Sequence, residues 1–336
     1  MKLRYLAALL CLCLSSELVF ANAPLRVAIV GDINGSYGSE DYPTLSLKLR
    51  DKVLALKPDL VISTGDVVAG QKRGLHQQQL HKMWQSFDHT FYQPLSEAGI
   101  VWLPVIGNHD GSKALNPLGK YLFQQDRQQA ESYWRNKLAS HPAITWLDKQ
   151  YYPFAYSVLL ADTALLVIDA SGAELTAAEW QWLKQQLASP AISHAKQRLV
   201  VGHLPLFSIA KGREAVGERL AKTDELLKLF SDYQVSWYIS GHQHAYYPAR
   251  VKQLNILMAG GIPARPLLGQ TSAQPVLSLL SLSTPLAIQS WDLHTDTELL
   301  PEQLPAAIPA LPYSISRWQP GTVMPCPTIK QQDPLC

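Results

Sequence analysis

Eight side chains able to bind a metal or move a proton fall into five short clusters along the sequence. Each cluster follows an apolar run and a glycine, and the residues are Asp32 and Asn34, Asp66, Asn108 and His109, His203, and His242 and His244. Carboxylates, amides and imidazoles together form a mixed oxygen and nitrogen donor set, which suits Zn, Fe, Mn or Co better than Ca. The sequence therefore predicts a transition-metal site.

Two of these side chains, Asp32 and Asp66, are carboxylates, and a carboxylate can bridge two metal ions. A carboxylate that bridges would hold two ions about 3.5–4 Å apart. Such a pair can generate hydroxide near neutral pH and neutralise the oxygens of an in-line displacement on phosphorus. A site with two ions could therefore support displacement at phosphorus.

The elements that must position these side chains are short apolar runs, which are typical of buried strands. Strands are expected at residues 25–31, 60–63, 100–106, 154–160, 165–168, 199–201 and 235–240, and at least two within 275–293. Helices are expected at residues 44–56, 75–97, 176–187 and 218–230. This order predicts an α/β layered fold, and the carboxyl ends of strands in open α/β sheets converge on one crevice. Thr176 is a candidate N-cap, with Glu179 three residues later.

The five clusters resemble, in order and spacing, the motifs of the calcineurin-like metallophosphoesterases. That family's pattern is Asp-x-His, Gly-Asp, Gly-Asn-His-Asp/Glu, His and Gly-His-x-His. Over roughly residues 25–260 this sequence reads Asp32-Ile33-Asn34, Gly65-Asp66, Gly107-Asn108-His109-Asp110, Gly202-His203 and Gly241-His242-Gln243-His244. The resemblance implies a four-layer αββα sandwich with two central β-sheets.

The resemblance also implies a role for each side chain. Asp66 would bridge two divalent or trivalent ions, which would be Mn, Fe or Zn. Asp32, Asn34 and His244 would bind the first ion. Asn108, His203 and His242 would bind the second. His109 would lie outside the ligand shell and either stabilise the phosphoryl group or protonate the leaving oxygen.

Two positions depart from the patterns of the family. Asn34 stands where the family usually has histidine, and an amide oxygen ligates less strongly than an imidazole. Residues 200–208 resemble the purple acid phosphatase branch, but Ala69 replaces the tyrosine of that branch's Gly-Asp-x-x-Tyr motif. A first metal site of altered strength or selectivity is therefore expected, and a ferric–tyrosinate centre is not.

Phosphomonoester hydrolysis is the favoured activity, acting on a small phosphorylated substrate. A phosphodiesterase or nucleotide hydrolase with the same centre is one alternative, and a binding protein on a degenerate phosphatase fold is another.

Arg265 follows two glycines and could bind phosphate through its guanidinium, or it could be a surface arginine in an ordinary turn. The formal net charge of +2 gives no sign of a nucleic-acid-binding surface. Nothing in the sequence indicates the oligomeric state.

The N-terminus has the pattern of a secretory signal peptide. Lys2 and Arg4 precede an apolar stretch at residues 6–14, and small residues follow at Ala21 and Ala23. The apolar stretch is too short to span a membrane comfortably. A signal peptide over residues 1–21, with cleavage there or after Ala23, predicts a periplasmic or secreted protein without a membrane anchor.

The rest of the chain is expected to be one catalytic domain and a tail. The domain would cover residues 24–300, with a polar, partly helical insertion at about 111–150 that shows no clear strand. Residues 301–336 hold 8 of the 23 prolines, so a tail without regular elements, packed on the body, is expected. Cys326 and Cys336 remain after removal of the signal peptide and would form a disulfide in an oxidising compartment.

Overall fold

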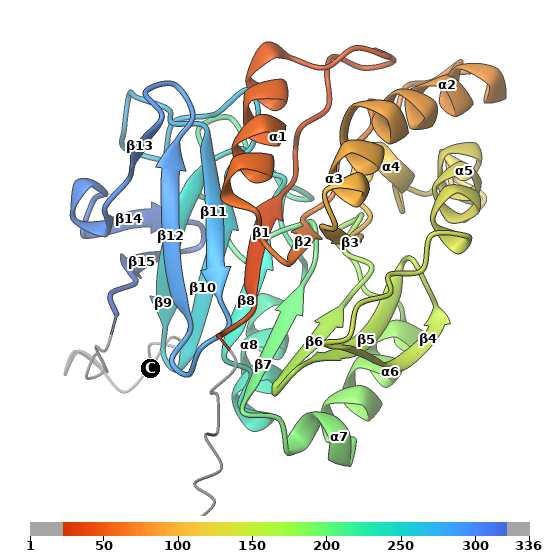
Figure 1. Cartoon of the computed structure of the whole chain (residues 1–336). Helices are drawn as coiled ribbons and strands as arrows, with labels where there is room; N and C mark the ends of the chain where they lie inside the picture. The colour runs from red at the N-terminus through yellow and green to blue at the C-terminus, as the bar shows by residue number, and fades with distance from the viewer. Residues whose placement is uncertain (1–22, 321–336) are drawn as a thin grey trace, which may run out of the picture.

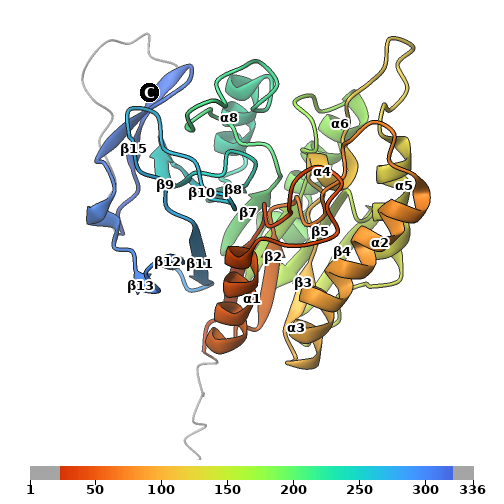
Figure 2. The same cartoon turned by 90° about the horizontal axis from the view of Figure 1, so that it is seen from above.

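The structure is a computed structural model that describes residues 23–320. Two β-sheets lie face to face at the centre, and helices cover the outer face of each (Figures 1 and 2). This arrangement confirms the four-layer αββα sandwich.

The smaller sheet carries the N-terminal part of the chain. Its six strands lie in the order β13-β12-β11-β1-β2-β3. They are β1 (Arg26–Val30), β2 (Leu60–Ser63), β3 (Val101–Leu103), β11 (Val276–Ser281), β12 (Ala287–Asp292) and β13 (Thr297–Glu298). The first three are parallel, and β11 pairs antiparallel with the free edge of β1. Its outer face packs against α1 (Thr44–Leu56), α2 (Gln77–Phe87), a π-helical turn η1 (Asp88–Tyr92), α3 (Gln93–Glu97) and α5 (Gln124–Arg135).

The larger sheet has nine strands in the order β14-β15-β9-β10-β8-β7-β6-β5-β4. They are β4 (Ile144–Tyr151), β5 (Ala155–Leu160), β6 (Thr163–Val167), β7 (Gln197–Val201), β8 (Trp237–Ser240), β9 (Tyr246–Val251), β10 (Leu254–Ala259), β14 (Ala307–Ala310) and β15 (Tyr313–Arg317). The helices on its outer face are α6 (Ala177–Ala188), α7 (Pro190–Ser193) and α8 (Thr223–Asp232).

Alternation along the buried strands supplies two separate cores. In β1, Val27 and Ile29 belong to the core between the sheets. The intervening Ala28 and Val30 pack instead with Leu49 of α1 and its neighbours. Because successive side chains of a strand point to opposite faces, one apolar run fills both cores. The strands are thereby fixed on both faces, which makes their ends a rigid platform.

Most of the predicted elements are present. The prediction for α1 is correct to the residue. Thr176 caps α6 in a capping box with Glu179, as predicted. Helix α8 begins at Thr223 rather than at residue 218, because the backbone at Lys222 is left-handed, with φ of 55°, and interrupts the helix there.

The expectation that residues 111–150 contain no clear strand is wrong. The segment holds α5, as a partly helical insertion should, but β4 occupies its end. Strand β4 lies at the edge of the larger sheet, and most of its side chains are partly or fully exposed. An edge strand of this kind carries no apolar alternation for a sequence pattern to detect.

The expectation that the tail lacks regular elements is also wrong. A short 3₁₀ helix η2 (Pro301–Gln303) leads into β14 and β15, and β15 pairs with β9. The prolines are compatible with this pairing, because Pro309 lies in the edge strand β14, where a backbone N–H is not needed for pairing on the outer side.

The predicted signal peptide and the predicted Cys326–Cys336 disulfide lie outside the described residues. No helix within residues 23–320 has the length and apolar character needed to cross a membrane.

Candidate metal centre

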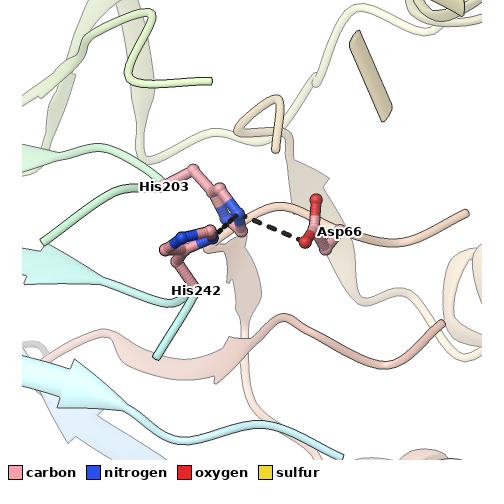
Figure 3. Close-up of side chains that lie close together, drawn as sticks. All are labelled: Asp66, His203 and His242. Carbon is pink, nitrogen blue, oxygen red and sulfur yellow. Dashed lines mark hydrogen bonds and ion pairs between the residues drawn. The ribbon is translucent and has the colours of Figure 1, made fainter. Parts of the chain in front are cut away.

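The five clusters meet in one place. They follow β1, β2 and β3 of the smaller sheet and β7 and β8 of the larger one, at the ends where those strands finish. Figure 3 shows Asp66, His203 and His242 pointing toward one another. Their ligand atoms all lie within 4.8 Å of one another, and all three residues are buried. The predicted convergence of strand ends is therefore confirmed.

The imidazole of His203 is at the middle of this group. Its Nε2 lies 2.8 Å from Asn108 Oδ1, 3.2 Å from Asp66 Oδ2 and 3.2 Å from His242 Nδ1. Its Nδ1 lies 2.7 Å from the carbonyl oxygen of Thr64, so Nδ1–H donates and fixes the ring. A carboxylate oxygen, an amide oxygen and two imidazole nitrogens thus face a common point, where a cation would satisfy all of them.

His242 is oriented by a residue that the sequence did not mark. Its Nε2 donates to Glu218 Oε2 at 2.9 Å, which leaves Nδ1 directed at the centre. Arg213 Nη1 donates to the same Glu218 oxygen at 2.8 Å. A carboxylate behind a ligating histidine fixes its tautomer and raises its basicity. The sequence predicts Glu218 at the start of a helix, and nothing in its neighbourhood in the sequence indicates this contact.

A second pair lies beside the first group. His244 Nε2 is 3.4 Å from Asp32 Oδ1, and His244 Nδ1 donates to the carbonyl oxygen of Pro263 at 2.9 Å. Both Asp32 oxygens accept from the backbone N–H of His242, at 3.0 and 2.9 Å. Asn34 is also buried, but within the described residues no hydrogen bond joins its side chain to another candidate ligand.

His109 lies just outside these groups. Its Nε2 is 3.9 Å from Asp66 Oδ2, its backbone N–H donates to Asp66 Oδ1 at 2.7 Å, and its Nδ1 lies 3.2 Å from the Gly70 carbonyl oxygen. The ring of Tyr37 packs against the imidazole at 4.6 Å between centroids. His109 is less buried than the other site histidines His203 and His242. It can therefore contact both the centre and a molecule arriving from solvent.

Asp110 ties two of the clusters together. Its carboxylate accepts from the backbone N–H groups of Asp66, Val67, Val68 and Gly107, at 2.7 to 3.0 Å. Burial, with help from the charge of Asp66, raises the pKa of Asp110 to about 7. The acidic residue of the Gly-Asn-His-Asp motif thus holds the loops after β2 and β3 in register.

The backbone is unusual at four of the candidate ligands. Asp32, Asp66, His242 and His244 all have left-handed φ values, from 50° to 66°. Such conformations are uncommon for residues other than glycine and cluster at functional sites. They turn each side chain back toward the centre as soon as its strand ends.

Two motif glycines make room for the ligands. A Cβ on Gly107 would lie 2.1 Å from Asp66 Oδ1, and a Cβ on Gly241 would lie 2.2 Å from Asp32 Oδ2. No side chain fits at those distances, so only glycine lets the two carboxylates reach their positions. The donor set and this close fit around it are compatible with bound metal ions.

Electrostatics prepare most of the imidazoles for ligation. Burial lowers the pKa of both His242 and His244 to about 4, so both are neutral near pH 7. Burial also disfavours charge on His203, but the adjacent Asp66 outweighs it and raises the pKa of His203 to about 9. Burial favours a protonated Asp66, but the surrounding imidazoles outweigh it, and the pKa of Asp66 stays below the usual range. A proton on His203 therefore supplies the positive charge that Asp66 requires.

Arg265 lies close to the second pair. Its backbone N–H donates to the His244 carbonyl oxygen at 2.8 Å. Burial, together with the charge of Arg213, lowers the pKa of its guanidinium. The side chain is partly buried rather than fully exposed.

The profile of the calcineurin-like phosphoesterases matches residues 25–246. The chain belongs to that family. Calcineurin-like phosphoesterases are metal-dependent hydrolases of phosphate esters, and this chain brings Asp66, His203 and His242 together as a group that could hold a metal ion. No curated protein sequence matches the chain.

Two solved structures with this fold have similar TM-scores against the chain. A purple acid phosphatase from yellow lupin (Lupinus luteus) seeds is 14% identical, with a TM-score of 0.57, and the match covers 82% of this chain and 52% of that one. This chain therefore spans about half the length of the lupin phosphatase. A Plasmodium protein described as the anchor in the inner membrane complex is 15% identical, with a TM-score of 0.55, and the match covers 88% and 90% of the two chains. At these identities the likeness concerns the fold.

Proposed function

We propose that this protein is an exported, metal-dependent phosphomonoesterase. The observation that carries the proposal is the convergence of Asp66, Asn108, His203 and His242 on one buried point, beside Asp32 and His244. A structural role for so many buried polar groups would leave them mutually satisfied. Here Asn108 Oδ1, Asp66 Oδ2 and His242 Nδ1 all face His203 Nε2 instead. A cation between these four atoms would satisfy all of them.

Two ions would divide the ligands as in the family. Asp66 would bridge them, Asp32, Asn34 and His244 would hold one, and Asn108, His203 and His242 would hold the other. When bound, such a pair lowers the pKa of water and neutralises the charge that develops on the phosphoryl oxygens. Glu218 supports this arrangement by directing His242 Nδ1 inward.

The leaving oxygen would receive its proton from His109. The His109 Nδ1–H can donate to the Gly70 carbonyl oxygen, which leaves Nε2 as the atom that carries and delivers the catalytic proton. Asp66 accepts from the backbone of His109 and so holds the imidazole at the edge of the centre. Arg265 would add a guanidinium contact to the substrate phosphate.

A monoesterase is favoured over a diesterase by the resemblance of residues 200–208 to the purple acid phosphatase branch. A phosphodiesterase or nucleotide hydrolase with the same centre would cleave bis-aryl phosphate at least as fast as aryl phosphate, and a panel of matched mono- and diesters distinguishes the two.

The experiment that tests the proposal is elemental analysis of the purified protein, paired with hydrolysis of an aryl phosphate monoester with and without added Mn. Two metal ions per chain and metal-dependent turnover are expected. A fully metal-loaded protein that hydrolyses neither mono- nor diesters would refute the proposal.

Export would be tested separately by N-terminal sequencing of protein recovered from the periplasm or medium, where a mature terminus at residue 22 or 24 is expected.

A binding protein without catalysis is the second candidate. A protein described as an anchor has the same fold, and Asn34 makes no hydrogen bond to the other candidate ligands among the described residues. Asn34→His would discriminate. If the centre is catalytic, the variant should hold the first metal more tightly and change turnover modestly. Activity that appears only in the variant would favour the binding protein.

A further inference from the structure

A cleft of about 800 Å³ opens beside the metal centre. It shares Asn108 and His242 with the centre, so a phosphate ester held at the metals would extend into it. One wall is the loop at residues 112–121, which precedes α5 and projects from the body in Figure 2. Tyr37 lines the cleft next to His109.

The positive charges that line this cleft are already neutralised. Lys113 Nζ lies 2.6 and 2.8 Å from the two carboxylate oxygens of Glu179, and it also donates to two backbone carbonyl oxygens. Arg213 is paired with Glu218. Glu174 adds a further carboxylate to the lining. Among the described residues that line the cleft, each lysine and arginine already has a carboxylate partner, so none brings an uncompensated positive charge to a second anionic group of a substrate.

The remaining wall is apolar and exposed. Tyr37, Leu115 and Tyr121 are exposed by 55%, 58% and 38%, and all three line the cleft. A backbone bridge joins Leu115 to Tyr121, and the Arg127 guanidinium packs 4.5 Å from the centre of the Tyr121 ring. These contacts hold the apolar side chains at the mouth of the cleft rather than letting them collapse into the core.

The position of Tyr37 connects this wall to the chemistry. Its ring lies against His109, the residue proposed to protonate the leaving oxygen. The group attached to that oxygen would therefore pass over Tyr37 as it enters the cleft. An aromatic or aliphatic group gains by covering exposed apolar surface there, at roughly 25 cal/mol per Å². A second phosphate or carboxylate would be desolvated without a partner.

We infer that the cleft is the leaving-group subsite, selective for phosphate monoesters whose alcohol carries an uncharged aromatic or aliphatic group and no second anion. The inference rests on the proposed phosphomonoesterase activity and adds its substrate class. Sugar bisphosphates and nucleoside polyphosphates are excluded by the same charge pattern.

The test compares 2-phenylethyl phosphate with glycerol 2-phosphate, since both release aliphatic alcohols and neither is favoured by an acidic leaving group. We expect kcat/KM to be at least about tenfold higher for the phenylethyl ester. Equal values, or a preference for the glycerol ester, would overturn the inference while leaving the phosphatase activity established.

Two leucines of one loop provide a matched pair of variants. Leu115→Asp places a charge in the cleft and should lower kcat/KM for the phenylethyl ester about tenfold, with glycerol 2-phosphate little affected. Leu118→Asp is the control, because Leu118 is 83% exposed and does not line the cleft. It should leave both esters unchanged. Equal effects of the two variants would contradict the assignment.

Binding of phosphonates, measured by calorimetry, separates this inference from the proposed function. The metal-loaded protein should bind 2-phenylethylphosphonate about tenfold more tightly than methylphosphonate, and Leu115→Asp should remove the difference. If no ester is hydrolysed but the difference persists, the catalytic proposal fails and the subsite stands. If esters are hydrolysed without any difference in binding, the subsite fails alone.

Discussion

His109 differs from His203 and His242 in exposure and in its contacts. His203 and His242 lie within the ligand group, whereas His109 reaches Asp66 from outside it at 3.9 Å. We expect His109→Ala to lower turnover by about 10²–10⁴-fold, which is typical of general acid catalysis. Metal content by elemental analysis should be unchanged, and loss of metal would show that His109 is structural. His81→Ala, in an exposed position of α2, is the control.

Glu218 contacts the centre only through His242, whose imidazole it orients. Its carboxylate accepts from His242 Nε2, and this hydrogen bond, together with the pairing with Arg213, lowers the pKa of Glu218 to about 2. Glu218→Gln keeps the size of the side chain but removes its charge. We expect it to weaken binding of one metal about 10–100-fold in a chelator competition, as is usual when such a carboxylate is removed.

Glu214→Gln provides the matched control for that experiment, because Glu214 is an exposed residue of the same loop. Its metal affinity should equal that of the unmodified protein. Weakening of the same size in both variants would mean that the charge of the loop matters, rather than the contact with His242.

The proton on His203 predicts how metal binding depends on pH. The pKa of His203 in the metal-free protein is raised to about 9, so an ion must displace a proton below that pH. Metal affinity should therefore rise about tenfold per pH unit between roughly pH 6.5 and 9 and level off above. Titration of zinc against a chelator at several pH values measures this slope. A flat profile would show that His203 is neutral before the metal arrives.

At the scale of elements, the sequence predicts the helices and strands whose pattern lies within their own residues. The ligand-bearing strands are largely buried, so each is an apolar run, and a glycine follows each of them. At Gly107 and Gly241 that glycine leaves room for a neighbouring carboxylate. The capping box of α6 is local as well. Edge strand β4 and the hairpin of β14 and β15 could not be predicted, because exposed or proline-containing strands are specified by their partners. The contact between Glu218 and His242 is likewise a product of tertiary structure.

The C-terminal hairpin is a structural part of the larger sheet. Trp318 is buried and packs against Trp237 of β8, with ring centroids 5.3 Å apart, and Ile315 of β15 is also buried. Trp318→Ala should therefore lower the free energy of unfolding by about 3 kcal/mol, which a denaturant titration measures. Leu311→Ala is a control in the turn of the same hairpin, where the side chain is exposed, and a loss below about 0.5 kcal/mol is expected. Similar stability of both variants would mean that the hairpin is only loosely attached.

At the scale of the molecule, the centre joins the two sheets. Its candidate ligands come from β1, β2 and β3 on one side and from β7 and β8 on the other. Metal bound there would stabilise the folded sandwich, because the ion would bind the folded chain in preference to the unfolded one. An ion at 100 times its Kd should add about 2.7 kcal/mol to the free energy of unfolding. Melting curves with Mn and with a chelator test this, and Asp66→Asn should abolish the difference. An unchanged melting temperature would contradict a centre that spans both sheets.

The position of β11 has a consequence for how the protein is made. β11 pairs with β1, the first strand of the chain, yet it is synthesised after every strand that carries a candidate ligand. A chain that leaves the ribosome therefore presents all its metal-binding side chains while one edge of its first sheet is still open. Open strand edges are prone to pair with other chains. The smaller sheet is thus completed late in synthesis. Until β11 pairs with β1, the newly synthesised chain must avoid aggregation through that open edge.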